Sequence, residues 1–202
     1  MMHRYTILAV TVLLCGGCVT VDMTVKENGG ADVVISYPAG ATTTEAQVKG
    51  VLTAPGITVT KVEITPAKAT APKLPKKGAK AAAPPSGKMV TATLTATKLE
   101  DLEQVPYLKV FGLDITTGGG GSEASTLKAV LKNHKPGRAS ALDSTNTIRV
   151  KLPGTVSKTS AKLEGGQVVW SFPTADYFKQ AALDVSISYK VAEAGDGSDS
   201  DS

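Results

Sequence analysis

The sequence predicts an α+β fold, a mostly antiparallel sheet of sequential hairpins with two or three short helices on one face. Runs of alternating apolar and polar residues recur along the chain, separated by turns that contain Gly or Pro. Ala, Thr, Val and Gly are abundant whereas aromatic residues make up only 4% of the chain, which favours a core of small and β-branched side chains on pleated strands. Only a few short segments between these runs have helical spacing.

The first seventeen residues predict a lipoprotein signal peptide. A basic start precedes an apolar run at residues 5–14, too short to span a bilayer, and the sequence CGGC follows at residues 15–18. Small residues before a cysteine resemble the lipobox of bacterial lipoproteins, which implies cleavage after Gly17, a diacylglyceryl group on Cys18 and labelling by palmitate. Cys15 departs from this pattern, because an aliphatic residue is usual there. The alternative is an ordinary signal peptide with two incidental cysteines.

Such processing leaves no free thiol, because Cys15 leaves with the signal and Cys18 is acylated. Disulfides, thiolate metal sites and cysteine catalysis are therefore not expected. His134 is the one histidine left, and its surroundings at residues 132–138 are typical of a solvated turn. Without a second histidine we expect no metal site and no cofactor, and a serine hydrolase would lack its base. We expect that the chain is not an enzyme.

Two segments are predicted to be disordered. Residues 66–88 form an insertion rich in Lys, Pro and Ala, without an acidic residue, and residues 192–202 form an acidic tail with Gly and Ser. Six lysines of the insertion are candidates for binding an anionic surface: Lys68, Lys73, Lys76, Lys77, Lys80 and Lys88. A solvated spacer is the alternative.

The first hairpin is predicted at residues 19–38, directly after Cys18, because apolar and polar positions alternate on both sides of a Gly-Gly turn. A short helix is expected within residues 42–56, with a Thr-rich cap and with Pro55 and Gly56 at its end. Its expected buried positions are Ala46, Val48, Val51 and Leu52.

Residues 57–65 and 89–97 are predicted to be neighbouring strands. The lysine-rich insertion between them is then an overgrown hairpin loop, since each doubling of loop length costs only about 0.6 kcal/mol. Residues 98–108 predict a short helix or turn, followed by a strand at residues 110–116. Its acidic residues, Glu100, Asp101 and Glu103, are interpreted as a solvated face, with a calcium or acid–base site as the alternative.

The glycine run at residues 118–121 lacks the Gly-Lys-Ser or Gly-Lys-Thr ending of a phosphate-binding loop, so a flexible hairpin tip is the better interpretation. Residues 126–133 suit either a helix or a strand. The last strand regions are predicted at residues 146–156, 160–173 and 183–191. The second of these is a hairpin that turns at Glu164, Gly165 and Gly166.

Three aromatic residues near the C-terminus are candidates for lining a ligand groove: Trp170, Phe172 and Phe178. Trp170 is interpreted as packing on the sheet close to Phe172, with ligand stacking as the alternative. Phe178 belongs to a predicted one- or two-turn helix that Thr174 would cap. A groove would have small residues such as Ala92 and Gly112 as its floor, with Trp170 or Phe178 closing it.

The order of these segments resembles a family of small bacterial lipoproteins that includes the mycobacterial LppM type. The resemblance rests on Cys18 leading straight into the hairpin at residues 19–38, and on the block at residues 150–172, where Pro-Gly, a strand, a Gly turn and a strand with Trp170 precede a short helix. It implies the fold class and membrane anchoring. The lysine-rich insertion and the acidic tail are departures from that pattern.

The sequence therefore predicts a single α+β domain at residues 18–191, lipid-anchored in the bacterial cell envelope. Outer-membrane delivery is expected in a cell with two membranes, because Val19 and not aspartate follows Cys18. We expect a non-enzymatic binding or envelope-structural module. The alternative is a periplasmic or surface carrier of a lipid or other amphiphile in an apolar groove. Expected partners are the membrane through the lipid, an anionic lipid or cell-wall polymer, and another envelope protein, but no nucleic acid.

Overall fold

The computed structural model describes residues 19–67, 87–119, 125–132 and 144–191. Within these residues, strands form two sheets, which together with four short helices confirm the predicted α+β class. The seven-stranded sheet has the order β3 (Ile57–Pro66), β4 (Gly87–Ala96), β2 (Ala31–Gly40), β1 (Thr20–Val25), β7 (Thr145–Lys151), β10 (Gln167–Pro173) and β9 (Lys162–Glu164). The four-stranded sheet has the order β5 (Leu113–Gly118), β6 (Ser125–Lys132), β11 (Ala182–Val191) and β8 (Gly154–Thr159). The helices are α1 (Glu45–Leu52), the 3-10 helix η1 (Leu99–Gln104), α2 (Pro106–Val110) and α3 (Thr174–Lys179).

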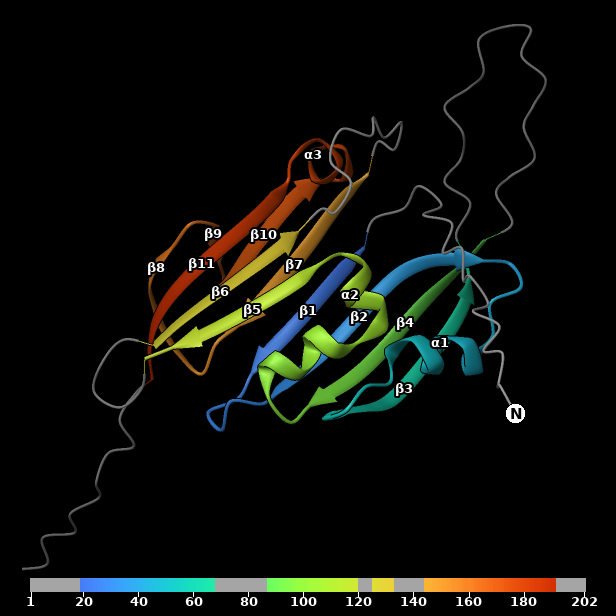
Figure 1. The fold of residues 1–202 in the computed structure, drawn as a ribbon, viewed down its shortest axis with the longest axis horizontal. Coiled ribbons are helices and arrows are strands. Elements are labelled where there is room, and N and C mark those ends of the chain that lie inside the picture. Colours follow the sequence, from blue (N-terminus) through green and yellow to red (C-terminus); the bar gives the residue numbers. More distant parts are fainter. Residues whose placement is uncertain (1–18, 68–86, 120–124, 133–143, 192–202) are drawn as a thin grey trace, which may run out of the picture.

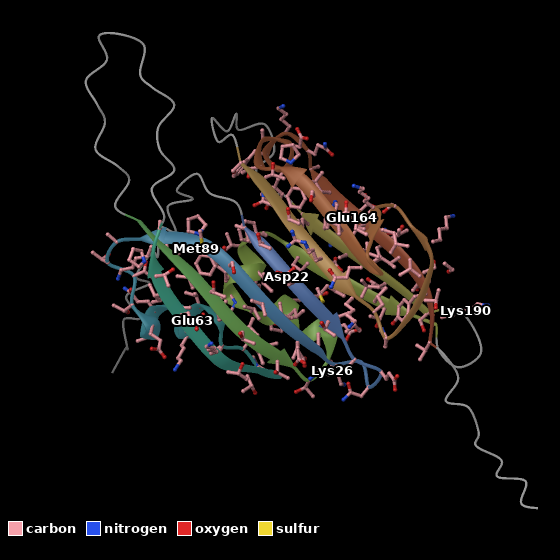
Figure 2. All side chains as sticks on the ribbon, turned by 180° about the vertical axis from the view of Figure 1, so that it is seen from behind. Asp22, Lys26, Glu63, Met89, Glu164 and Lys190 are labelled. Atoms are coloured by element: carbon pink, nitrogen blue, oxygen red, sulfur yellow. The ribbon has the colours of Figure 1, made fainter. Side chains whose placement is uncertain are left out.

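The molecule has two layers. In Figure 1 the four-stranded sheet lies in front of β1, β7 and β10, whereas α1 and α2 lie in front of β2, β3 and β4. One hydrophobic core joins residues of both sheets and of the helices. Figure 2 shows the opposite face of the seven-stranded sheet, where exposed charged residues such as Asp22 and Glu63 lie.

The predicted first hairpin is confirmed as the antiparallel pair β1–β2, in which Val21 lies opposite Ile35. Its turn contains Gly29 at a φ of 81°, a left-handed conformation that glycine adopts without strain. β1 also pairs in parallel with β7. This parallel pair differs from the predicted series of sequential antiparallel hairpins, and it joins the N-terminal and C-terminal parts of the chain in one sheet.

The strands on either side of the lysine-rich insertion are neighbours, as predicted. β3 and β4 pair antiparallel from Ile57 opposite Ala96 to Pro66 opposite Lys88, with a register shift between Val59 and Lys61. Both ends of the predicted disordered range 66–88 therefore belong to strands. Residues 68–86 lie outside the described residues.

Helix α1 lies within the predicted range and has the predicted threonine cap. The backbone N–H of Gln47 donates to Thr44 Oγ1 at 3.4 Å, and the N–H of Thr44 donates to Gln47 Oε1 at 2.9 Å. Together these bonds form a capping box. Val48 and Leu52 are buried as expected, whereas Ala46 is exposed, because it lies on the opposite side of this short helix.

The segment after β4 folds as the two short helices η1 and α2, and its carboxylates hold it in place. Asp101 Oδ2 accepts a bond of 2.9 Å from the N–H of Lys98. Glu103 accepts the N–H of Ile115, and Glu100 accepts the hydroxyl hydrogen of Thr117. Two of these acidic side chains thus connect η1 to β5.

The chain changes sheets within the predicted strand region at residues 146–156. β7 belongs to the larger sheet and β8 to the smaller one, and Pro153 and Gly154 lie at the crossing. A Cβ atom at Gly154 would overlap the carbonyl oxygen of Lys190, so this close approach of β8 to β11 requires glycine. The described part of the ambiguous segment at residues 126–133 is a strand, β6, which pairs with both β5 and β11.

The predicted Gly-turned hairpin near the C-terminus is confirmed as β9–β10, with Gly165 and Gly166 at φ values of 55° and 78°. Helix α3 follows, but Pro173 and not Thr174 occupies its N-cap position. The expected cap is therefore wrong. The Thr174 hydroxyl makes hydrogen bonds with Ser144 and Asn146 instead.

Candidate functional site

A cavity of about 110 Å³ lies between the two sheets. Its walls are built from inward-facing residues of β1, β2, β5, β6, β7, β10 and β11, and η1, α2 and α3 complete them. An apolar cavity of roughly 150 Å³ in another protein binds benzene, so the volume suits a ring or a section of a hydrocarbon chain.

The inward faces of the central strands are incompletely covered. Successive strand residues point to opposite faces, so Met23, Ala129 and Ile148, which line the cavity, face the interior. All three are nevertheless only half-buried. Because protein interiors are normally packed without such gaps, these half-buried apolar residues show that side chains do not fill the space between the sheets.

Aromatic rings follow one side of the cavity from β2 through α2 to α3. Tyr37 stacks on Tyr107 with ring centroids 4.6 Å apart. Tyr107 contacts Phe111 at 5.5 Å, and Phe111 contacts Tyr177 at 6.1 Å. Phe178 continues the series at 5.4 Å from Tyr177. These contacts connect α2 with α3, although the two helices are far apart in the sequence.

A small polar group interrupts the apolar lining. The hydroxyl oxygens of Ser144 and Thr174 lie 2.6 Å apart, and Asn146 Nδ2 donates to Thr174 Oγ1 at 3.0 Å. Asn146 Oδ1 accepts the backbone N–H of Val19 at 3.3 Å. We call Ser144, Asn146 and Thr174 the polar cluster. All three line the cavity, and Ser144 and Thr174 are buried.

The described lining of the cavity includes no Asp, Glu, Lys, Arg or His. Charged residues of the same strands lie on the outer face, as in the ion pair between Arg149 Nη1 and Asp22 Oδ1 at 3.2 Å. Burial raises the pKa of Tyr37 to about 12, and burial together with the nearby Tyr37 raises the pKa of Tyr107. These phenols therefore stay protonated and uncharged at neutral pH.

The structure places the three aromatic candidates around this cavity. Trp170 and Phe172 lie on β10 with ring centroids 5.1 Å apart, and Phe178 lies on α3. Ala92 and Gly112, the expected floor, do not line it. Ala92 is fully buried on β4, and Gly112 packs closely against the backbone of Lys132.

The predicted lipidation site and most of the predicted basic residues lie in parts of the chain that the structure does not describe. Cys18 and the insertion lysines Lys68, Lys73, Lys76, Lys77 and Lys80 lie outside the described residues, as does His134. Lys88 is described, and its Nζ donates to the carbonyl oxygen of Thr43 at 2.8 Å, which connects β4 to the loop before α1.

Tyr107 of α2, Phe111 directly after it and the polar cluster were not predicted from the sequence as parts of the site. Tyr107 and Phe111 are four residues apart, a spacing that places two side chains on one face of a helix. This spacing was the available signal for the aromatic side of the cavity. The polar cluster offered no such signal, because Ser144 and Thr174 are 30 residues apart.

Two further properties of the described residues concern metal binding and membrane spanning. No group of three His, Cys, Asp or Glu side chains in this part of the chain could hold a metal ion. Among the helices of the described residues, none is both long and apolar enough to span a bilayer.

Comparison with known proteins found similarity in structure but not in sequence. No protein-family model matches the chain, and the search of curated proteins found no match. The chain is similar to the NMR structure of the folded domain of LppM from Mycobacterium tuberculosis, with a TM-score of 0.44 and 12% sequence identity, covering 86% of this chain and 88% of that one. LppM is also the type of lipoprotein that the order of the sequence segments resembles.

Proposed function

We propose that this chain is a lipid-anchored envelope protein whose domain binds the apolar part of an amphiphile in the cavity between its sheets. The observation that carries the proposal is the incompletely filled, uncharged cavity with half-buried Met23, Ala129 and Ile148 in its walls. Covering such apolar surface is favourable by about 25 cal/mol per Å². A hydrocarbon chain or ring would gain this free energy there.

The polar groups of the cavity support binding and not catalysis. A serine or threonine nucleophile needs an adjacent base. The hydroxyls of Ser144 and Thr174 bond to each other and to an amide, which cannot accept a proton in that role. We therefore propose a non-enzymatic binding module, and the carrier function expected as the alternative from sequence becomes the leading one.

The expected anchor, Cys18, directly precedes in the sequence a residue that lines the cavity. Val19 lines the cavity, and its carbonyl oxygen accepts the N–H of Thr147 at 2.9 Å, which extends the ladder between β1 and β7. Cys18 precedes Val19, and consecutive Cα atoms are about 3.8 Å apart. An acylated Cys18 would thus place the cavity close to the membrane surface, where amphiphiles are concentrated.

The chain carries a built-in reporter for this proposal. Trp170 is its single tryptophan and lines the cavity. In a full chain with Cys18→Ser, which has no lipid of its own, we expect a brominated long-chain hydrocarbon to quench Trp170 fluorescence. An unbrominated competitor should reverse the quenching.

The matched variants are Ala129→Phe and Ala182→Phe. Phenylalanine at 129 would fill the cavity and should abolish quenching, whereas residue 182 is exposed and outside the lining, so that variant should bind normally. Thermal unfolding of both variants shows whether each remains folded. Absence of quenching in the parent chain, or undiminished quenching in Ala129→Phe, would contradict the proposal.

A further inference from the structure

We infer that the polar cluster of Ser144, Asn146 and Thr174 selects amphiphiles with an uncharged, oxygen-bearing head, such as the ester and hydroxyl groups of a monoacylglycerol. This inference rests on the proposed function, because it concerns the head of a ligand whose apolar chain lies in the cavity. The cluster is the part of the described lining where several side-chain hydrogen-bonding groups meet.

The cluster has hydrogen atoms to donate. Thr174 Oγ1 accepts one hydrogen bond from Asn146 Nδ2 and shares another with Ser144 Oγ. Whichever hydroxyl donates in the shared bond, the hydrogen of the other hydroxyl is left for a further acceptor. The second N–H of Asn146 Nδ2 is left as well. Among the described residues neither hydrogen has an acceptor, so the cluster favours a ligand oxygen.

The two hydroxyl groups of the cluster are not needed to hold the strands together. The backbone N–H of Thr174 already donates to the carbonyl oxygen of Ser144 at 2.8 Å, directly beyond the paired residues Thr145 and Pro173. Hydroxyl groups at this point therefore add little to the ladder. Apolar side chains of similar size would complete an apolar cavity better, since buried polar groups are unfavourable unless they are hydrogen-bonded.

The same lining disfavours a charged head. A carboxylate or phosphate brought into a cavity without a cationic side chain would lose its hydration, which is far more unfavourable than the loss for a neutral group. The described lining includes no Lys, Arg or His. An ester or hydroxyl oxygen can accept the available hydrogens without this penalty.

Trp170 fluorescence tests the inference in the Cys18→Ser chain with three brominated probes of equal chain length: a monoacylglycerol, a hydrocarbon and an ionised fatty acid. We expect the monoacylglycerol to bind about tenfold more tightly than the hydrocarbon, as two hydrogen bonds of ordinary net strength would produce. The ionised fatty acid should bind more weakly than the monoacylglycerol. Thr174→Val should remove the preference for the monoacylglycerol over the hydrocarbon.

The matched control is Thr147→Val. Thr147 Oγ1 on β7 lies 3.2 Å from Ser171 Oγ on β10, and both residues are outside the cavity lining. This variant removes the same kind of hydroxyl pair and should keep the preference. If Thr174→Val does not fold, Ser144→Ala replaces it, and thermal unfolding decides which variant is used.

The outcomes separate the inference from the proposed function. Equal binding of monoacylglycerol and hydrocarbon, or an equal loss of preference in Thr147→Val, would overturn the inference and leave an unselective apolar site. Tightest binding of the ionised fatty acid would also overturn it, because the cavity would then prefer a charged head. Quenching by none of the three probes would overturn the proposed function and the inference together.

Discussion

Gly112 shows how a single residue determines how closely the elements that line the cavity can pack. It connects α2 to β5 at a φ of 60°, and its carbonyl oxygen accepts the N–H of Lys132 at 3.0 Å. A Cβ atom at this position would overlap the carbonyl oxygen of Lys132. Glycine is therefore required twice, for the left-handed conformation and for the close approach of β6. Tyr107 of α2 and Phe111 directly after it depend on this connection for their position.

Gly112→Ala should destabilise the protein more than Gly165→Ala. Gly165 has nearly the same φ of 55°, but nothing lies within 4 Å of a Cβ placed there. The left-handed conformation alone should lower the free energy of unfolding by about 1–2 kcal/mol in Gly165→Ala. Overlap with Lys132 should add about 1–3 kcal/mol in Gly112→Ala. Urea unfolding of both variants measures the difference. Equal losses of unfolding free energy would show that β6 can move away from a Cβ atom at position 112.

At the scale of elements, short-range signals account for the parts that fold as predicted. α1 begins at a capping box formed by Thr44 and Gln47, and an ion pair of 2.7 Å between Lys49 and Glu45 lies along its exposed side. Its buried residues, Val48 and Leu52, pack it beside β3. With eight residues, α1 is too short to be stable alone. Its cap and its packing must act together.

Thr44→Ala should lower the free energy of unfolding by about 1 kcal/mol, because it removes the acceptor for one of the free N–H groups at the helix start. The control is Thr42→Ala, an exposed position just before the helix. Urea unfolding with an unchanged m value would attribute the loss to the folded state. A loss of the same size in Thr42→Ala would indicate a general effect of threonine in this loop and not capping.

At the scale of the whole molecule, Val19 links the cavity to the proposed anchor, because Val19 lines the cavity and Cys18 directly precedes it in the sequence. Its backbone bonds to Asn146 and Thr147 fix the start of β1 at the polar cluster. A lipid on Cys18 would hold this end of the domain at the bilayer. The proposed transfer of an amphiphile between membrane and cavity then needs little passage through water.

A flexible spacer of 20 residues between Cys18 and Val19 should slow this transfer, since a Gly/Ser-rich chain of that length spans roughly 25 Å on average. Trp170 quenching by brominated monoacylglycerol supplied in vesicles measures the rate. The cavity itself is unchanged, so the extent of quenching at equilibrium should stay the same. The same spacer appended to the C-terminus serves as control. Equal quenching rates for the two chains would show that the distance between anchor and cavity does not affect how fast the cavity is loaded.

The cavity arises from long-range arrangement and not from any one segment. The bond between Val19 and Asn146 joins residues 127 positions apart, and the polar cluster combines the start of β7 with the start of α3. Local patterns in the sequence could not place these groups together. They did place Trp170 and Phe172 on one face of a strand, because strand residues two apart point the same way.

By itself the sequence determined the elements whose causes are local: the β1–β2 and β9–β10 hairpins, where glycines occupy left-handed turns, and α1, where threonine supplies the cap. Only the tertiary structure decided that β1 pairs in parallel with β7 and that the chain passes from one sheet to the other at Gly154. Alternation tells which face of a strand is buried but not which strand lies beside it. A cavity is space left between two packed faces, so it depends on how the sheets and helices meet and on no single stretch of residues.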